Sequence, residues 1–168
     1  NSFQFILDQL GDKAIYYKPK FWFWVDHKYA FLNKLGVYRR AIRYQYPWEK
    51  SNKKYLLILH NDVYFKDDLV GKYLEGIGNH TAIGKIGQCW NCPAHMSNLC
   101  DANRYTKYKP DYQEVMNLFA QYPESRSFKQ RFYIDRKRPW TLLECRMNEY
   151  VTLINLEKAR PATMPYGK

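Results

Sequence analysis

The 168-residue sequence has few acidic side chains, few cysteines and no long apolar run. Its 16 Asp and Glu face 27 Lys and Arg, which gives a net charge of +11. The longest apolar stretches are residues 21–25 and 55–59, whereas a membrane helix needs about 18 such residues, so we expect no membrane-spanning segment. The first residues carry no basic leader and lack Met. We therefore expect a cytoplasmic protein with no secretory signal and a processed or trimmed start.

The remaining composition is that of a folded protein. Apolar residue types make up 46% of the chain, which excludes the low-hydrophobicity signature of disorder. A chain of this length buries about 70% of its unfolded surface, so the sequence predicts a single domain over residues 1–168. The positive charge attracts anions, which include nucleic acid, acidic lipid and phosphorylated small molecules. Peripheral association with a membrane surface is therefore compatible with the sequence.

The four cysteines are too few for a disulfide scaffold of this size. Three of them fall within residues 89–100, and the first two are separated by two residues, which is a spacing that can chelate zinc. The set Cys89, Cys92, His95 and Cys100 predicts a structural Zn²⁺ site, with Cys145 as another candidate for the fourth ligand. A disulfide and ordinary buried thiols are the alternatives.

The order of apolar patterns predicts an α/β fold. Residues 53–60 read as a buried strand, residues 67–77 as a helix and residues 81–87 as the next strand. Such a unit predicts a single three-layer, Rossmann-like domain with a mostly parallel central sheet. Residues 115–122 are expected to form a helix, and a final helix is expected to carry Tyr150, Val151, Leu153 and Ile154. Between the second strand and these helices we expect an irregular insertion around residues 88–112, rich in Cys and Tyr.

A candidate metal site follows the first strand. Ligands of open parallel sheets bind beyond the carboxyl ends of the strands, where Asp62 lies in the sequence. One carboxylate oxygen can hold Mg²⁺ or Mn²⁺ while phosphates and water fill the other positions. His60 is a candidate second ligand. The alternative for Asp62 is a turn or capping role.

Residues 56–69, with the sequence LLILHNDVYFKDDL, resemble the Asp-x-Asp region of glycosyltransferases with the GT-A fold, especially the family-2-like group. Residues 82–87 resemble the next strand of those enzymes, and residues 140–146 lie where the family places a catalytic base at the start of a late helix. The resemblance covers about residues 53–160, so part of the N-terminal nucleotide-binding half has no counterpart here. The first position of the acidic motif is His60 instead of Asp.

The resemblance implies an inverting, metal-dependent glycosyltransferase that uses a UDP- or GDP-sugar. Asp62, with His60, would bind Mn²⁺ or Mg²⁺ at the donor diphosphate, and Glu144 would be the catalytic base, with Glu149 as a substitute. Both glutamates could instead be acids near a helix N-terminus. The residues assigned to donor binding are Asn61, Gly87, Trp90 and Arg138, where Trp90 could also be a core residue and Arg138 a solvated loop cation.

Two other functions remain open from the sequence. One is a zinc-stabilised basic module that binds nucleic acid through aromatic stacking and phosphate contacts. The aromatic residues fall mostly at apolar core spacings, so nucleic acid is the less favoured partner. The other is a non-catalytic, glycosyltransferase-like interaction domain, because a fold by itself does not determine activity.

Overall fold

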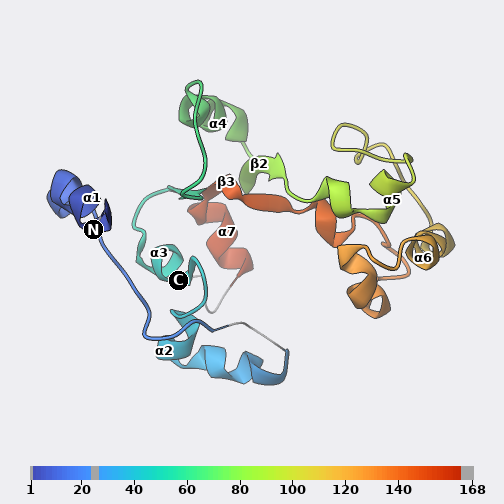
Figure 1. The fold of residues 1–168 in the computed structure, drawn as a ribbon, viewed down its shortest axis with the longest axis horizontal. Helices are drawn as coiled ribbons and strands as arrows, with labels where there is room; N and C mark the ends of the chain where they lie inside the picture. The colour runs from blue at the N-terminus through green and yellow to red at the C-terminus, as the bar shows by residue number, and fades with distance from the viewer. Residues whose placement is uncertain (1, 24–26, 164–168) are drawn as a thin grey trace. The chain divides into compact units, whose positions relative to one another are not determined.

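The computed structural model describes residues 2–23 and 27–163, and its internal contacts group into two compact units (Figure 1). The first unit comprises residues 1–53 and 160–168, and the second comprises residues 54–159. The sequence-based description as one domain stays a prediction. Each unit is described by itself below.

The regular elements of the first unit, within its described residues, are all helices. Helix α1 ends where Gly11 adopts a positive φ of 54°, a conformation that glycine tolerates at no steric cost. The Arg39 guanidinium forms an ion pair with Glu49, which connects α2 to α3. Arg160 donates hydrogen bonds to the carbonyls of Trp48 and Ser51, at 2.7 and 2.6 Å. The elements of this unit are α1 (Ser2–Leu10), η1 (Gly11–Lys13), η2 (His27–Lys34), α2 (Gly36–Arg39) and α3 (Gln45–Lys50).

The second unit contains a three-stranded antiparallel sheet. Its strands are β1 (Tyr55–Leu59), β2 (Ala82–Ile86) and β3 (Met147–Asn155), in the order β1-β3-β2. The central strand β3 runs antiparallel to both neighbours, with Leu153 opposite Leu57 on one side and Ile83 on the other. Figure 1 shows β2 beside β3. Strands β1 and β2 therefore have the same direction but are separated by β3.

The predicted mostly parallel, three-layer sheet is wrong, and the cause is the segment now seen as β3. We expected residues 150–154 to form a helix, but they lie in the central strand. Tyr150, Val151, Thr152 and Ile154 are β-branched or aromatic, and these residue types favour a pleated, half-buried surface. The helix that follows, α7 (Leu156–Ala162), begins only after the strand ends.

The order of elements from β1 to β2 was predicted correctly. Helix α4 (Leu69–Ile77) connects the two strands, and Asp68 caps it by accepting a hydrogen bond from the Gly71 amide at 2.8 Å. This carboxylate satisfies one of the amides that a helix start leaves without an internal partner. The predicted helix near residue 115 is also confirmed as α6 (Tyr112–Gln121), which begins with a capping box between Asp111 and Glu114.

Residues 87–146 join β2 to β3 without adding a strand. Their core includes one face of α6 together with two buried cysteines. None of the described helices, in either unit, has the length and apolar character required to cross a bilayer. The core cluster consists of Cys92, Ala94, Cys100, Val115, Leu118, Phe119 and Leu142. The other elements are η3 (Cys89–Asn91), α5 (Pro93–Met96), η4 (Arg126–Tyr133) and η5 (Leu143–Cys145).

Candidate functional site

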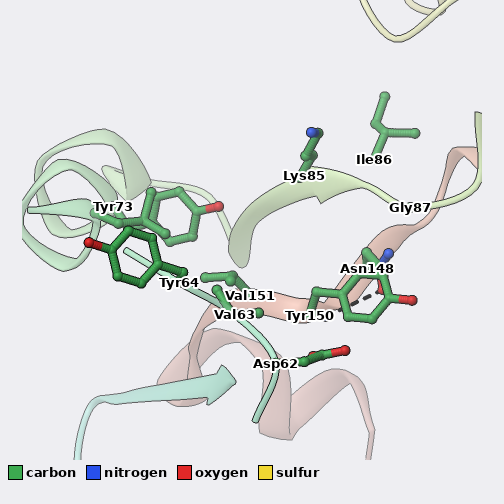
Figure 2. Close-up of a pocket in the computed structure, with 11 residues that line it drawn as sticks. Asp62, Val63, Tyr64, Tyr73, Lys85, Ile86, Gly87, Asn148, Tyr150 and Val151 are labelled. Carbon is green, nitrogen blue, oxygen red and sulfur yellow. Dashed lines mark hydrogen bonds between the residues drawn. The ribbon is translucent and has the colours of Figure 1, made fainter. Parts of the chain in front are cut away.

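A cavity of about 620 Å³ opens beyond the carboxyl end of β1 in the second unit. The turn after β1, helix α4, the end of β2 and the first half of β3 contribute its walls (Figure 2). This size lies within the range of about 300–1,000 Å³ that is usual for small-molecule sites. Its polar and aromatic lining residues are Asp62, Tyr64, Tyr73, Lys85, Asn148 and Tyr150.

Asp62 presents its carboxylate to this cavity. Its side chain is 69% exposed, and its Oδ1 lies 3.0 Å from Nδ1 of His60. His60 is itself held by β3, because its backbone amide donates to the Tyr150 carbonyl at 2.9 Å. The His60 ring also meets the Tyr150 ring edge to face, with 4.9 Å between the ring centroids. The contact with His60 therefore orients an accessible carboxylate, and its role as a metal ligand stays a prediction.

The wall opposite Asp62 is formed where the end of β2 approaches the start of β3 closely. A Cβ added at Gly87 would lie 3.1 Å from Cβ of Asn148, so glycine allows the end of β2 to approach this side chain. The Tyr150 amide donates to Oδ1 of Asn148 at 3.3 Å, which orients the Asn148 amide group (Figure 2). Gly87, predicted from the sequence as a donor-site residue, thus lines the cavity by allowing backbone approach.

Three tyrosines and one lysine complete the chemistry of the cavity. Figure 2 shows Tyr64 and Tyr73 at one end and Tyr150 near Asp62 at the other. Burial raises the pKa of Tyr73, so its phenol stays protonated and can donate a hydrogen bond at neutral pH. Lys85 brings a positive charge from β2. The lining therefore offers a carboxylate, an ammonium group and aromatic faces to a ligand.

Glu144, the predicted catalytic base, is not in this cavity. It is only 1% exposed and belongs to η5. Its Oε1 accepts a hydrogen bond from the Ser127 amide at 2.8 Å, and its Oε2 is buried without a hydrogen-bond partner among the described residues. A carboxylate in this position connects η5 to η4 and does not line the cavity that contains Asp62.

The other predicted site residues are also not brought to the cavity. Glu149 lies in β3 between Asn148 and Tyr150, which both line the cavity, but is not itself among the lining residues. Trp90 is 70% exposed in η3, and Arg138 is exposed in the loop after η4; neither lines the cavity. Asn61 is exposed in the turn beside Asp62.

Sequence reasoning missed the tyrosines, Lys85 and Asn148. Lys85 could have been found, because it is the single charged residue in the otherwise apolar strand Ala82–Ile86. Asn148 and Tyr150 could not be assigned to a wall while their segment was expected to lead into a helix. Tyr64 and Tyr73 flank the capping residue Asp68, so only the geometry of the turn shows that they share a cavity.

The four cysteines form a second chemical feature of the same unit, and all four are free thiols. Cys92 and Cys100 are each 2% exposed, whereas Cys89 and Cys145 are half-buried. The thiols of Cys92 and Cys145 share a hydrogen bond. Cys89 and Cys100 interact electrostatically with each other and with both members of this pair. Backbone contacts bring the same segments together: the Cys92 amide donates to the Cys89 carbonyl, and the Gln88 amide donates to the carbonyl of Glu144, the residue before Cys145.

This arrangement changes the acidity of the thiols. The hydrogen bond with Cys145, together with burial, raises the pKa of Cys92, and the same hydrogen bond lowers the pKa of Cys145. Burial raises the pKa of Cys89 and Cys100, and the neighbouring thiols act in the same direction. The protonation of Cys92 and that of Cys145 therefore depend on each other.

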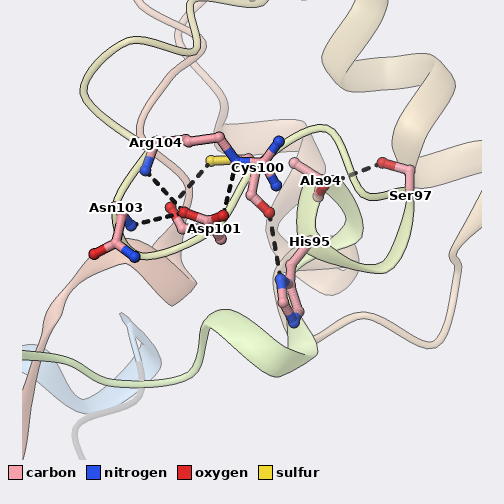
Figure 3. Close-up of polar contacts among 7 residues, drawn as sticks. All are labelled: Ala94, His95, Ser97, Cys100, Asp101, Asn103 and Arg104. Atoms are coloured by element: carbon pink, nitrogen blue, oxygen red, sulfur yellow. Dashed lines mark hydrogen bonds and ion pairs between the residues drawn. The ribbon is translucent and has the colours of Figure 1, made fainter.

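Nδ1 of His95 lies 3.3 Å from the Cys100 carbonyl oxygen, so this nitrogen is engaged and does not point to a shared metal position (Figure 3). The next residue, Asp101, accepts hydrogen bonds from the amides of Asn103 and Arg104 at 2.8 and 2.9 Å, which fix the loop after Cys100. Within the described residues, no three His, Cys, Asp or Glu side chains are already arranged as a metal site. The zinc site expected at Cys89, Cys92, His95 and Cys100 therefore stays a prediction.

Comparison of the chain with protein-family models, with curated proteins and with solved structures finds no match. The resemblance to glycosyltransferases thus remains a hypothesis based on residues 53–160. Its parallel-sheet expectation is overturned by the antiparallel order of the strands. The functional proposal below depends on the geometry of the cavity.

Proposed function

We propose that this protein is a metal-dependent glycosyltransferase whose cavity beyond β1 binds a nucleotide-diphosphate sugar. The observation that carries the proposal is the exposed, His60-oriented carboxylate of Asp62 in a cavity of about 620 Å³ that also contains Lys85 and three tyrosines. This set of groups matches the parts of such a donor: a cation-bound diphosphate, a sugar and a base.

Asp62 would hold the Mn²⁺ or Mg²⁺ ion. Hard divalent cations take oxygen ligands and are commonly bound by one or two carboxylates together with substrate phosphates and water. The contact with His60 uses Oδ1 of Asp62 and fixes the rotation of the carboxylate. Bound there, the metal ion would neutralise negative charge on the diphosphate leaving group.

The other lining groups contribute to recognition of the donor. The Lys85 ammonium group complements phosphate oxygens. Tyrosine faces pack against sugar rings and stack on nucleobases, and their hydroxyl groups supply hydrogen bonds. The Asn148 amide can both donate and accept. These residues provide binding and leaving-group stabilisation, while the buried Glu144 takes no part in proton transfer.

Calorimetric titration tests the proposal. The protein is titrated with UDP and with GDP, each with and without Mn²⁺, and we expect binding that requires the cation. Asp62→Asn keeps the size of the side chain but removes its charge, so it should weaken Mn²⁺-dependent binding at least tenfold, which is about 1.4 kcal/mol. Asp67→Asn is the matched control, because Asp67 is an exposed carboxylate outside the cavity lining.

The two variants decide the outcome. Full affinity in Asp62→Asn, or equal weakening in Asp67→Asn, would contradict the role of Asp62. Absence of Mn²⁺-dependent binding of both nucleotides in the unmodified protein would overturn the donor-site proposal. Release of the free sugar or its transfer from a bound donor, measured by chromatography, tests the transferase reaction separately from binding.

A further inference from the structure

We propose that Cys89, Cys92, Cys100 and Cys145 together bind one Zn²⁺ ion that ties the long connection between β2 and β3. This ligand set differs from the one expected from the sequence, because Cys145 takes the place of His95. The site is independent of the donor cavity: none of the four cysteines lines that cavity.

The backbone brings the four thiols together from three segments. Cys89 and Cys92 lie at either end of a tight turn in which the Cys92 amide donates to the Cys89 carbonyl at 3.0 Å. The Cys100 amide donates to the Ala94 carbonyl at 2.9 Å, which folds this segment back onto the start of α5. The Gln88 amide donates a hydrogen bond to the Glu144 carbonyl at 3.4 Å, which places the residue after Glu144, Cys145, near the turn that begins at Cys89.

Two of the four cysteines share one core cluster. Cys92 and Cys100 are each 2% exposed and belong to the cluster that includes one face of α6. The apolar surroundings of a metal site limit the access of solvent to its ligands. These two residues therefore have the enclosed position of structural metal ligands.

Four thiolates are a complete ligand set for tetrahedral zinc. His95 is not required, and its Nδ1 is already occupied by the Cys100 carbonyl oxygen. Within the described residues, these side chains are not arranged as a closed metal site. Zinc binding must therefore release the thiol protons and draw the sulfur atoms to about 2.3 Å from the ion.

The connection between β2 and β3 has few regular elements and a small core, so a bound metal ion would stabilise it. Residues 87–146 contribute no strand, and their only α-helix longer than four residues is α6. Their core cluster is small and includes Cys92 and Cys100 themselves. Small, loop-rich regions with little core are commonly stabilised by a metal or a disulfide. A zinc ion bound to Cys145 would join the end of this connection to its beginning at Cys89.

Metal analysis of matched variants tests the ligand set. The full chain and the variants Cys145→Ser and His95→Asn are produced in zinc-supplemented medium, and zinc is measured by mass spectrometry. We expect one zinc ion per chain in the unmodified protein and in His95→Asn, and less than a fifth of that amount in Cys145→Ser. Asp62→Asn should keep its zinc, so that failure of the donor-site proposal would leave this result unchanged.

Cobalt substitution and alkylation provide readouts that do not depend on the folding of a variant. Co²⁺ added to the metal-free protein should produce the strong near-ultraviolet bands of thiolate ligation and the visible bands of tetrahedral cobalt. Bound zinc should also protect all four cysteines from alkylation by iodoacetamide. Absence of zinc and of the cobalt bands, loss of zinc in His95→Asn with retention in Cys145→Ser, or a Cys92–Cys145 disulfide found by mass spectrometry would each overturn the proposal.

Discussion

Substitution of Glu144 separates a catalytic carboxylate from a structural one. The sequence assigns Glu144 to the acceptor hydroxyl, but the structure buries it with one oxygen bonded to the Ser127 amide. Glu144→Ala removes the acceptor and leaves this buried amide without a partner. Glu144→Gln keeps the side-chain length and an oxygen that can accept the same hydrogen bond.

The expected loss of stability follows from these contacts. A buried group left unsatisfied costs about 1–3 kcal/mol, and the loss of one buried methylene adds about 0.8 kcal/mol. Glu144→Ala should therefore lower the free energy of unfolding by about 2–4 kcal/mol. For a chain of this size each kcal/mol changes Tm by about 2–4 °C, so a decrease of at least about 4 °C is expected. The loss in Glu144→Gln should be less than half as large.

Thermal unfolding by circular dichroism and nucleotide calorimetry measure the two properties on the same samples. We expect both variants, where folded, to bind nucleotide diphosphate and Mn²⁺ as the unmodified protein does, because Glu144 lies outside the cavity lining. The structural assignment is refuted if Glu144→Gln retains the Tm and donor affinity of the unmodified protein but loses glycosyl transfer. That result would restore the catalytic role that the sequence suggested.

Three further predictions concern caps and protonation. Asp68→Ala removes the cap on the Gly71 amide and should cost about 1 kcal/mol in chemical denaturation, while Asp68→Asn should retain most of it. Burial raises the pKa of Glu49, but hydrogen bonds from Arg39 and Gln45 and the charges of Arg39 and Arg40 outweigh burial and lower it. The stability that these contacts contribute is present above the unfolded pKa of about 4.3 and is lost as the pH falls. In Glu49→Gln the free energy of unfolding should therefore depend less on pH in the acid range. Burial raises the pKa of Cys89, so zinc-free protein should lose stability as the pH rises above the unfolded thiol pKa of about 8.5. Zinc-loaded protein, whose thiolates are already formed, should lose less.

Local sequence signals predicted much of the secondary structure. The apolar run of β1, the cap at Asp68 and the helix of α6 each depend on residues that are neighbours in the chain. Asp62 was placed for the same reason: an acidic residue shortly after a strand lies beyond the end of that strand in either sheet type, although β1 proves to be a half-buried edge strand and not a central one. These features survive the change from a parallel to an antiparallel sheet because they involve only local geometry.

The partners of β1 and β2 could not be obtained in this way. Strand pairing joins residues about 100 positions apart, as in Leu57 and Leu153, and no local pattern records which strand lies in the middle. The spacing of Tyr150, Val151, Leu153 and Ile154 fits one face of a helix as well as a strand covered on both sides. Side-chain type was the better guide here, since β-branched and aromatic residues favour strands.

A single strand therefore accounts for the error in the fold and for the lining residues that the sequence did not indicate. Once β3 occupies the centre of the sheet, its first residues provide Asn148 and Tyr150 as a wall of the cavity, opposite the turn that carries Asp62. The same strand begins two residues after Cys145, whose backbone neighbour Glu144 meets Gln88 at the end of β2. The segment expected to supply a catalytic helix instead joins the ligand cavity to the cysteine cluster through a continuous backbone. Both proposals for this unit thus depend on a long-range pairing that only the three-dimensional structure shows.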